Sequence, residues 1–493
     1  MIRDLLDRGS PSSVAISVAG GASLSYERLR GEVDELAAKL SGAGIGRGDR
    51  IAIALPNGLE AVVSFLAASI AGTAAPLNPA YKLDEFRFYL GDTGARALIV
   101  PPEGADEARR AADARTLIIE VEAGSEGKIR SSCENTKPVI NPALDDTALV
   151  LHTSGTTSRP KRVPLSHRNI MTSARNVAET YGLTSEDVSL CVMPLFHVHG
   201  LVASTLATLY TGGTVVVVPR FNPLSFWASV RDYGATWYSA VPTIHQVLLS
   251  RARSGSRPAG AENLRFIRSC SASLPAQMMA DMEERFGVPV VEAYGMTEAA
   301  HQMASNFLPP GTRKPGSVGR GTGVQITILD DKGNALATGS RGEVAIKGPN
   351  VFSGYEENPE ANAASFTDGW FRTGDEGSVD SDGFLVLTGR IKELINRGGE
   401  KISPREVDEA LLAHGAVSEA VCFGIPDKVY GEEVAAAVVL QGEASESELI
   451  AHCKSLLADF KAPKVIYLID AIPRTATGKV QRRNVAAEIL KSD

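Results

Sequence analysis

The chain has 493 residues, and a soft prior of about 150 residues per domain predicts two or three units. It carries 50 Lys and Arg against 58 Asp and Glu, a formal charge of −8. This mild acidity argues against a nucleic-acid binder, which needs a basic surface to neutralise phosphates. With 44% hydrophobic and 22% charged residues, the composition is that of an ordinary globular protein and excludes disordered and fibrous classes.

Five cysteines occur singly, without a CxxC pair: Cys133, Cys191, Cys270, Cys422 and Cys453. This pattern favours a reducing compartment over a disulfide framework or a zinc site. The first residues, MIRDLLDRGSPSS, carry charges where a signal peptide needs an apolar segment. The longest apolar stretch, 61–77, contains polar residues and is shorter than the roughly 20 residues of a membrane-spanning helix. We therefore expect a cytoplasmic enzyme without a membrane span.

Short apolar runs alternate with helical patterns through the first 300 residues. A helix is predicted over 60–71, and strands are predicted, in chain order, over 51–55, 97–100, 117–121, 148–151, 188–193, 214–218, 237–241 and 290–293. The run TVVVV at 214–218 is apolar on both faces, which is typical of a buried parallel strand. Strand, helix, strand at this spacing predicts an α/β class with helix-covered parallel sheets.

The sequence pattern changes after Gly311: turn-forming residues become frequent, and the apolar runs between them are short. This pattern predicts antiparallel strands in a β-barrel-like subdomain. After Gly389 and Arg390 the chain shows a self-contained α+β pattern of about 100 residues. Helices are predicted there over 406–412 and 446–457, with strands over 420–424 and 434–440.

The most specific segment is a hydroxyl-rich loop, LHTSGTTSRPK at 151–161, between an apolar strand and a helix that opens near Ser166. Such a loop can turn backbone N–H groups and side-chain hydroxyls onto a phosphate. It is not a Walker A loop, because GxxxxGK[ST] is absent. A solvated Ser/Thr loop is the plain alternative, and the loop alone does not decide between the two.

A second segment, YGMTE at 294–298, follows the strand predicted over 290–293. A carboxylate beside a hydroxyl at the carboxyl end of a strand can hold Mg²⁺ against phosphate oxygens. The neighbouring Tyr294 could stack on a base. In isolation, the segment is better explained by a packed Tyr294 and a solvated Glu298.

Three further segments are weak when taken singly: TGD at 373–375, GRIK at 389–392 and PRTATGK at 473–479. An Asp can accept hydrogen bonds from both ribose hydroxyls, and an Arg nearby can add another contact. The last segment is a loop that presents a lysine. Exposed Asp, Arg and Lys are, however, usually only solvated.

Together, in this order, the five segments resemble the adenylate-forming superfamily of acyl-CoA synthetases, aryl-CoA ligases, luciferases and peptide-synthetase adenylation domains. The resemblance covers nearly the whole chain. It implies a large N-terminal domain over 1–389, a hinge at 390–392 and a small mobile C-terminal domain over 393–493. The active site would lie between these domains, with ATP, Mg²⁺ and coenzyme A as the implied cofactor set.

The resemblance also implies a nucleotide site. The phosphate-binding residues would be Thr153, Ser154, Gly155, Thr156, Thr157 and Lys161. The adenine would contact Tyr294, Gly295 and the strand Ser271, Ala272 and Ser273, and the ribose would contact Asp375 and Arg390.

The catalytic roles implied by the resemblance fall mainly on Lys479, which would approach the nucleotide from the small domain. Glu298 would hold the metal beside the phosphate-binding Thr297. His197, in PLFHVHG at 194–200, would gate the acyl site. Lys392 would be the pivot, and Gly399 would line the tunnel for CoA.

Two positions depart from the family pattern, because Ser158 and Arg162 stand where relatives usually have glycine. Glycine reaches φ > 0 and lets the backbone approach a phosphate. Arg162 therefore implies either that this end of the loop keeps φ < 0 or that the guanidinium adds a phosphate contact.

The implied reaction joins a small carboxylic acid to CoA through an acyl-adenylate, releasing AMP and pyrophosphate. Wall candidates for the acid are 238–243, Ser271 and the run 299–303. A fatty-acyl tunnel needs apolar walls, whereas Ser271 and His301 could bind a second carboxylate. TSGTTSRPK and MTEAAHQMASN look most like the oxalate–CoA ligase branch, so oxalate is the leading hypothesis. A fatty-acyl- or aryl-CoA synthetase, with His301 in a solvated loop, is the alternative.

Three rival classes remain open. A module that loads a carrier protein shares the first half-reaction, but no carrier segment is present on this chain. A luciferase-like oxygenase is neither indicated nor excluded. A non-catalytic AMP sensor would be expected to lose the lysine, yet Lys479, Glu298 and Asp375 are all present. The oligomeric state is left open.

Overall fold

The structure is a computed structural model that describes residues 1–153, 160–252, 256–474 and 480–492. By its internal contacts the chain forms two compact units. The larger unit comprises Met1–Gln325 and Lys347–Phe366, and the smaller comprises Ile326–Ile346 and Thr367–Asp493. Each unit is described by itself.

The larger unit contains a seven-stranded sheet with a parallel centre. Its order is β7-β6-β5-β3-β4-β8-β9, and only the outer pairs β6–β7 and β8–β9 are antiparallel. The strands are β3 (Arg50–Ile53), β4 (Thr73–Pro76), β5 (Ala97–Val100), β6 (Leu117–Ala123), β7 (Ile129–Ser131), β8 (Thr147–Thr153) and β9 (Lys161–Ser166).

A nine-stranded sheet completes the β-structure of this unit, in the order β16-β15-β14-β13-β12-β10-β11-β1-β2. The strands are β1 (Val14–Val18), β2 (Ser23–Ser25), β10 (Val188–Cys191), β11 (Thr214–Val217), β12 (Trp237–Ala240), β13 (Phe266–Ser269), β14 (Val290–Met296), β15 (His301–Ser305) and β16 (Arg320–Gly321). β11 pairs in parallel with both β10 and β1, which confirms the buried parallel strand predicted from TVVVV.

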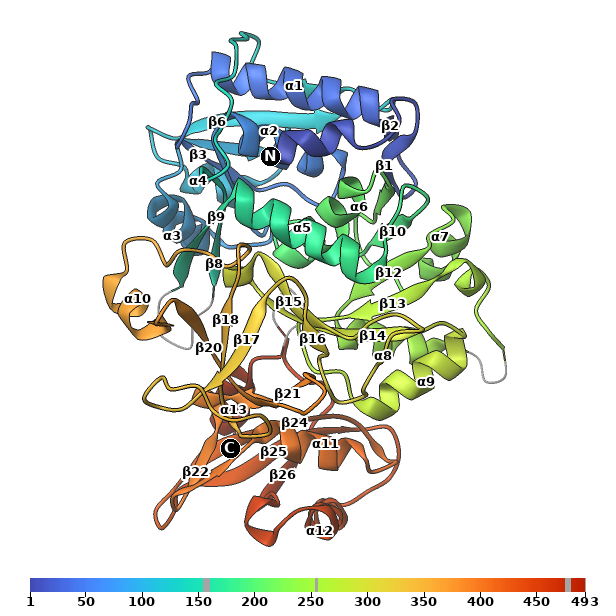
Figure 1. The fold of residues 1–493 in the computed structure, drawn as a ribbon, viewed down its shortest axis with the longest axis vertical. Coiled ribbons are helices and arrows are strands. Elements are labelled where there is room, and N and C mark those ends of the chain that lie inside the picture. The colour runs from blue at the N-terminus through green and yellow to red at the C-terminus, as the bar shows by residue number, and fades with distance from the viewer. Residues whose placement is uncertain (154–159, 253–255, 475–479, 493) are drawn as a thin grey trace. The chain divides into compact units, whose positions relative to one another are not determined.

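Helices α2 (Leu59–Ala71) and α5 (His167–Tyr181) contact both sheets. In α2 every residue except Glu60 is buried, and the helix contacts β4, β6 and β8 of one sheet and β1 of the other. α5 contacts β8 and β9 as well as β15, and Figure 1 shows it crossing this part of the unit. A helix that is apolar all round belongs in a core, which explains the composition of α2.

The other helices of this unit cover the outer faces. They are α1 (Tyr26–Gly42), which packs on α2, α3 (Leu83–Thr93), α4 (Asp106–Ala111), α6 (Ala207–Tyr210), α7 (Phe226–Asp232), α8 (Pro242–Arg251), α9 (Ala276–Phe286) and α10 (Pro359–Ser365). A π-helical segment, η2 (His199–Leu206), precedes α6, and short 3₁₀ turns lie at η1 (Ile2–Asp7), η3 (Ala261–Asn263) and η4 (Thr297–Ala299).

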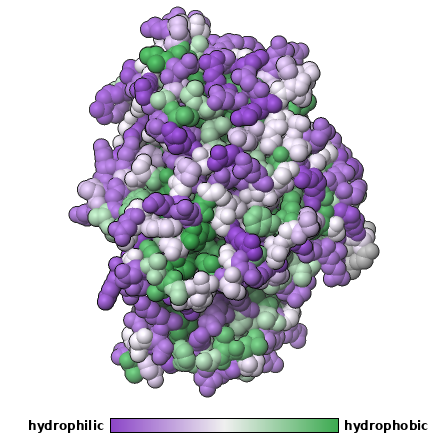
Figure 2. Space-filling model, in the orientation of Figure 1, coloured by the Kyte–Doolittle hydropathy of each residue, from purple (hydrophilic) through white to green (hydrophobic). Residues whose placement is uncertain are grey.

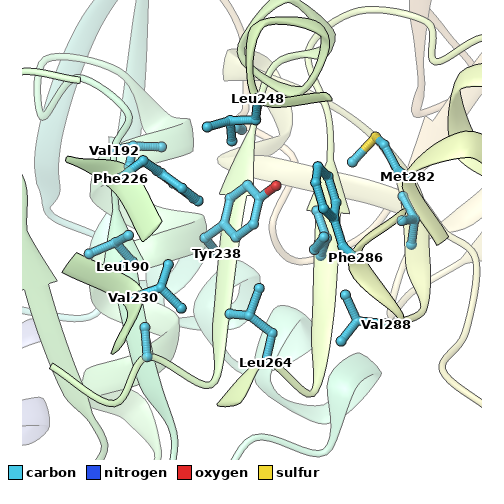
Figure 3. Close-up of a cluster of buried hydrophobic side chains, with 14 of the residues drawn as sticks. Leu190, Val192, Phe226, Val230, Tyr238, Leu248, Leu264, Met282, Phe286 and Val288 are labelled. Carbon is cyan, nitrogen blue, oxygen red and sulfur yellow. The ribbon is translucent and has the colours of Figure 1, made fainter. Parts of the chain in front are cut away.

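The alternation of side chains along β12 separates an apolar core from a polar face. Tyr238 lies inside a buried cluster with Phe226, Leu248 and Phe286 from α7, α8 and α9 (Figure 3). Because successive residues of a strand point to opposite faces, Ser239 lies on the other side of the sheet. Tyr238, which we had expected in the wall of the acid site, therefore belongs to the core.

The smaller unit contains two antiparallel-rich sheets. The first has β17 (Gln325–Leu329), β18 (Gly342–Lys347), β19 (Phe366–Thr367), β20 (Trp370–Val379) and β21 (Leu385–Arg390). The second has β22 (Ile395–Arg397), β23 (Glu400–Ile402), β24 (Val417–Asp427), β25 (Gly431–Leu440) and β26 (Val465–Leu468). A 3₁₀ turn, η5 (Ile391–Glu393), lies between the two, and another, η6 (Asp459–Lys461), precedes β26.

Alternation along β25 gives the second sheet two covered faces. Val434, Ala436 and Val438 are buried with side chains of α11 (Pro404–Leu412) and α12 (Glu446–Leu456). Ala435 and Ala437 are buried with Val485 of α13 (Arg482–Ser492). The segment after Arg390 thus has a hydrophobic core of its own on each face of the sheet.

The predicted α/β class, with helix-covered sheets and a separate antiparallel part, is confirmed. Most predicted elements agree to within two or three residues, but β9 was not predicted between the hydroxyl-rich loop and α5. The domain limits at 389 and 393 remain predictions. No helix within the described ranges is long and apolar enough to cross a membrane, and Figure 2 shows hydrophilic side chains spread over the face in view.

Candidate active site

The hydroxyl-rich segment lies between two paired strands rather than between a strand and a helix. β8 and β9 form an antiparallel pair in which Thr153 is opposite Lys161. The described residues on either side of 154–159 are therefore neighbours in the sheet. Ser154, Gly155, Thr156 and Thr157, predicted to bind phosphate, lie outside the described residues.

Arg162 takes part in a cluster of carboxylates. Its Nε atom lies 3.3 Å from Glu356 and 3.8 Å from Asp92, and the guanidinium also pairs with Glu357. Arg162 pairs with His152 in the β8–β9 ladder and is not among the residues with positive φ. Of the two alternatives for Arg162, the loop end that keeps φ < 0 is correct, and the guanidinium is held by carboxylates.

A buried tyrosine joins the end of the loop to the predicted metal ligand. The Nζ atom of Lys161 lies 4.4 Å from the centre of the Tyr355 ring. The hydroxyl of Tyr355 donates a 2.9 Å hydrogen bond to Oε1 of Glu298, whose side chain is itself buried. The backbone N–H of Phe352 donates to the carbonyl of Glu298, so the 347–366 segment holds the η4 turn. Lys161 and Glu298 are thereby brought together.

The residues around Glu298 fit Mg²⁺ bound mainly by a substrate. Mg²⁺ is usually held by one or two carboxylates together with substrate phosphates and water. Among the described residues there is no group of three or more His, Cys, Asp or Glu side chains that could hold a metal ion. One fixed carboxylate, Glu298, beside the hydroxyl-bearing Thr297 therefore suits a magnesium–nucleotide complex better than a resident metal.

The β14–β15 hairpin carries Glu298 and His301 on a tight connection. The register shifts between Tyr294 and Gly295, and a Cβ atom on Gly295 would overlap the carbonyl group of His301. Ala300 and His301 have φ angles of 51° and 120°, and Ser271 has a φ of 74°. Non-glycine residues in such conformations cluster at functional sites, where the surrounding structure maintains them.

Strand register places a charged residue beside Ser239 in the interior. Ser239 of β12 is opposite Arg268 of β13, so the two side chains share one face of the sheet. Arg268 Nη1 donates to Ser239 Oγ at 2.9 Å, and neither side chain is exposed. Arg268 is thus a fully buried guanidinium in the sheet that carries the predicted acid site.

A chain of hydrogen bonds runs outward from Arg268. Ser239 Oγ lies 2.7 Å from His199 Nε2, and His199 Nδ1 lies 3.1 Å from Ser271 Oγ. Arg268 Nη2 lies 3.4 Å from His301 Nδ1. Because a guanidinium only donates, Nδ1 of His301 must accept this bond. The rings of His199 and His301 meet edge to face with centroids 5.1 Å apart.

The remaining donors of Arg268 have neutral partners. Nε donates to the hydroxyl of Tyr181 at 2.9 Å, and Nη2 donates to Oε1 of Gln302 at 3.0 Å. Gln302 is held in turn by Thr180 and Thr322, each 3.1 Å from its Nε2. The orientation of the guanidinium is therefore set on every side.

The other residues predicted for the nucleotide and acyl sites lie on or after strands of the nine-stranded sheet. Tyr294 is largely buried on β14, while Ser271, Ala272 and Ser273 follow β13 and remain partly or fully accessible. His197 is half-buried ahead of η2, with its ring 4.8 Å from that of Phe196. The solvated-loop interpretation of His301 is wrong, because His301 is 2% exposed and begins β15.

The smaller unit brings together the two residues predicted to bind ribose. Asp375 of β20 is opposite Arg390 of β21, and Arg390 Nε lies 2.6 Å from Asp375 Oδ1. Lys392 is exposed on η5, and Gly399 has a φ of 97° in the turn between β22 and β23. Lys479 lies outside the described residues.

Sequence reasoning missed three residues of this region: Tyr355, His199 and Arg268. His199 stands in the PLFHVHG segment, but the gate was assigned to His197 alone. The local signal for Arg268 was weak: it is a charge three residues before Ser271, in a segment that also contains Arg265. No local signal marks Tyr355, because its partner Glu298 is 57 residues away.

A parallel-sheet unit with a fixed acid and a hydroxyl-rich segment in its sequence, and a smaller unit with an Asp–Arg pair, are features expected of an adenylate-forming enzyme. The AMP-binding enzyme family matches residues 7–356, and its C-terminal domain family matches residues 406–479. The chain belongs to the AMP-binding enzyme family and is an AMP-forming acid–CoA ligase, a class that uses ATP, Mg²⁺ and CoA.

Similar proteins span nearly the whole chain. It is 49% identical to "Probable CoA ligase CCL9" of Humulus lupulus, over 97% of this chain and 93% of that protein. It is 48% identical to "Oxalate–CoA ligase" of Arabidopsis thaliana, over 98% and 96%, and 47% identical to "Oxalate–CoA ligase" of Saccharomyces cerevisiae, over 90% and 88%.

Two solved structures have the same fold over nearly their full lengths. ATP-bound MatB from Rhodopseudomonas palustris is 32% identical, with a TM-score of 0.91 over 99% of this chain and 98% of that one. The MenE o-succinylbenzoate CoA synthetase of Bacillus subtilis, in complex with ATP and magnesium, is 31% identical, with a TM-score of 0.86 over 98% and 99%.

Proposed function

We propose that the acid is oxalate, so that the chain forms oxalyl-CoA from oxalate, ATP and CoA. The observation that carries this proposal is a polar group at the predicted acid site, in which His199 is hydrogen-bonded to Ser271 and its ring contacts that of His301. A long apolar acid needs an apolar channel, whereas a short acid with two carboxylates needs donors. The names of the Arabidopsis and yeast relatives support the same substrate.

In the proposed reaction, one oxalate carboxylate attacks the α-phosphorus of ATP and pyrophosphate leaves. The CoA thiol then attacks the acyl carbon of the adenylate and expels AMP. The first step brings two anions together, and unit charges 4 Å apart repel by about 1 kcal/mol in water and about 4 kcal/mol at an effective dielectric of 20. Positive groups must therefore be delivered to the site before the bond can form.

We assign this role to Lys161 and Lys479, with Glu298 and Thr297 holding Mg²⁺, which supplies a divalent charge against the phosphate oxygens. The hydroxyl of Tyr355 orients Glu298 by a hydrogen bond, and the ring of Tyr355 makes a cation–π contact with the Nζ atom of Lys161. Preorganised charges of this kind stabilise a transition state because they need not reorient during the reaction.

The nucleotide is proposed to lie with its adenine on Tyr294 and Gly295, against the strand Ser271, Ala272 and Ser273. Its phosphates would meet the loop from Thr153 to Lys161, including Ser154, Gly155, Thr156 and Thr157. Asp375 would accept hydrogen bonds from the ribose hydroxyls, and Arg390, 2.6 Å away, keeps this carboxylate oriented.

We further propose that the domain over 393–493 moves about a hinge at 390–392, with Lys392 as pivot. In one position it presents Lys479 to the phosphates, and in the other it opens a path for CoA past Gly399. His197 is proposed to gate the acyl site. Five free cysteines support a reducing, cytoplasmic location.

A panel of acids tests the substrate. Pyrophosphate release is measured with oxalate, octanoate and ferulate, and CoA-thioester formation is followed without any partner protein. The proposal predicts a kcat/KM for oxalate at least about 100-fold above that for the other two acids, since each misfit in such a site costs several kcal/mol. Octanoate or ferulate activated better than oxalate would contradict it, and a requirement for a carrier protein would favour the loading module.

Substitution of the lysine separates the two half-reactions. Lys479→Ala is expected to abolish adenylate formation while sparing thioester formation from a supplied oxalyl-adenylate. Arg483→Ala, a nearby basic residue on α13, serves as a control for loss of positive charge. Equal loss of both half-reactions in the Lys479 variant would refute its proposed role.

A further inference from the structure

Arg268 is a buried charge without a counter-ion in the protein. Its side chain is completely inaccessible, and within the described ranges no carboxylate lies within ion-pair distance of it. Its partners are two hydroxyls, an amide oxygen, an imidazole nitrogen and the side chain of Cys270, none of which is a carboxylate. Isolated charges are costly to bury and arginine does not lose its proton, so this interior keeps one uncompensated positive charge.

The hydrogen bonds from this charge lead to the proposed acid site. Ser239, which accepts from Arg268, contacts His199, and His199 contacts the partly accessible Ser271. The other branch runs directly from Arg268 to His301. The charge is therefore linked directly to His301, and through the side chains of Ser239 and His199 to Ser271.

From this arrangement we propose that Arg268 is a specificity-determining positioning residue that selects acids bearing a second anionic group. It does not touch the acid. It supplies a fixed positive potential behind the site and holds His301 and Ser239 in place for the second carboxylate. The inference deepens the proposed function and rests on it.

The hydrogen bonds of Arg268 also define what the two histidines do. Since Nδ1 of His301 accepts from the guanidinium, a neutral His301 ring carries its proton on Nε2, which is a donor. Selection of a dianion then does not require a protonated histidine, because the permanent charge lies on Arg268. The side chains of His301 and Ser271 orient the second carboxylate of the acid, and the positive charge of Arg268 attracts it.

The test compares two acids of nearly equal shape. Oxalate carries two negative charges at neutral pH, whereas oxamate has an amide in place of one carboxylate and carries only one. The quantity measured is the ratio of kcat/KM for oxalate to that for oxamate, from pyrophosphate release. In Arg268→Gln this ratio is expected to fall about 10- to 100-fold, as expected for loss of a unit charge near an anion in a partly desolvated site.

Three further variants separate charge from structure. Arg268→Lys keeps the charge, so it is expected to keep the ratio within about threefold of wild type although the rate falls. Tyr181→Phe removes one partner of the guanidinium without changing charge and is also expected to keep the ratio. Arg251→Gln removes an exposed positive charge from α8 and controls for net charge.

Each outcome decides the matter. A folded Arg268→Gln enzyme, with the wild-type KM for ATP and an unchanged ratio, would overturn the inference. If Arg268→Gln does not fold, the decision rests on Arg268→Lys, where loss of the ratio would overturn it and retention would support it. If wild type does not use oxalate but prefers another dicarboxylate to its monoamide, the oxalate proposal fails. The role of Arg268 is then tested by the ratio of kcat/KM for that dicarboxylate to that for its monoamide. If wild type uses no dicarboxylate, both fail.

Discussion

The hydroxyl of Tyr355 donates a 2.9 Å hydrogen bond to Oε1 of Glu298. The same ring lies under the Nζ atom of Lys161, so one side chain orients an acid and a base of the candidate active site. Tyr355→Phe removes the hydrogen bond and keeps the ring. We expect about a 10-fold fall in kcat for pyrophosphate release, because a hydrogen bond to a charged group is worth about 1.5 to 3 kcal/mol.

The measurement is pyrophosphate release over a range of Mg²⁺ concentrations, where Tyr355→Phe should need more Mg²⁺ for half-maximal activity. Tyr355→Leu loses the ring as well and should be impaired further, since the cation–π contact with Lys161 also disappears. A Phe variant that matches wild type at every Mg²⁺ concentration would show that the hydrogen bond does not position the acid.

Gly295 allows β14 and β15 to approach each other where the register shifts. In Gly295→Ala the new Cβ atom would overlap the carbonyl group of His301, so the hairpin must open. We expect a loss of about 1 to 3 kcal/mol in the free energy of unfolding, typical of overpacking. The kcat/KM for oxalate should fall as well, because His301 moves with its backbone.

Gly31→Ala is the matched control. Gly31 lies in α1, and a Cβ atom there would meet nothing within 4 Å. Alanine in a helix interior is favoured over glycine, so this variant should be unchanged or more stable by up to about 1 kcal/mol. Urea denaturation of both variants gives the comparison, and a Gly295→Ala protein as stable and active as wild type would disprove the close approach.

Arg162 is held by carboxylates, so its removal should affect stability more than nucleotide binding. In Arg162→Gly the cluster of Asp92, Glu356 and Glu357 loses a cation, although Arg50 still pairs with Glu356. We expect a loss of about 1 to 3 kcal/mol in the free energy of unfolding, limited because Glu357 is largely exposed. The KM for ATP should stay within about twofold of wild type. A large rise in this KM with unchanged stability would instead indicate a phosphate contact.

Much of the architecture was predictable because each element carries its own periodicity. The strand TVVVV at 214–218 and the mostly apolar α2 indicate burial by their residue types. The strand β9 was missed because KRVPLS mixes charges and a proline with two apolar residues, a weak signal for any element. Its pairing with β8 is a tertiary contact that cannot be predicted from the local sequence pattern.

The candidate site was predictable only where its residues sit in local motifs. Glu298 was found because it follows the strand predicted over 290–293, and Ser271 and His301 were found through the resemblance of their segments to the family. Tyr355 and Arg268 have partners that are distant in sequence. Their roles become visible only in the folded structure, where strand register pairs Arg268 with Ser239 and the 347–366 segment brings Tyr355 to Glu298. The buried Arg268 also contradicts the usual expectation that an arginine in the sequence is solvated.

His167 makes the stability of the larger unit depend on pH. Its side chain is wholly buried at the start of α5, and this burial lowers the pKa of the imidazole from 6.5 to about 4. Between these values the unfolded chain takes up a proton that the folded protein does not. Stability therefore rises with pH from about 4 to 6.5 and is lost as the pH falls through this window, by about 3 kcal/mol from this residue.

Urea denaturation at a series of pH values between 4 and 7 measures this dependence. His167→Gln should flatten the slope without abolishing it, because burial also lowers the pKa of His245, to about 3, with the same sign of effect. His414→Gln, at a partly accessible position after α11 in the smaller unit, serves as the control for loss of a histidine elsewhere. If the His167 variant retains the full slope, the acid sensitivity arises at another group and not from the buried start of α5.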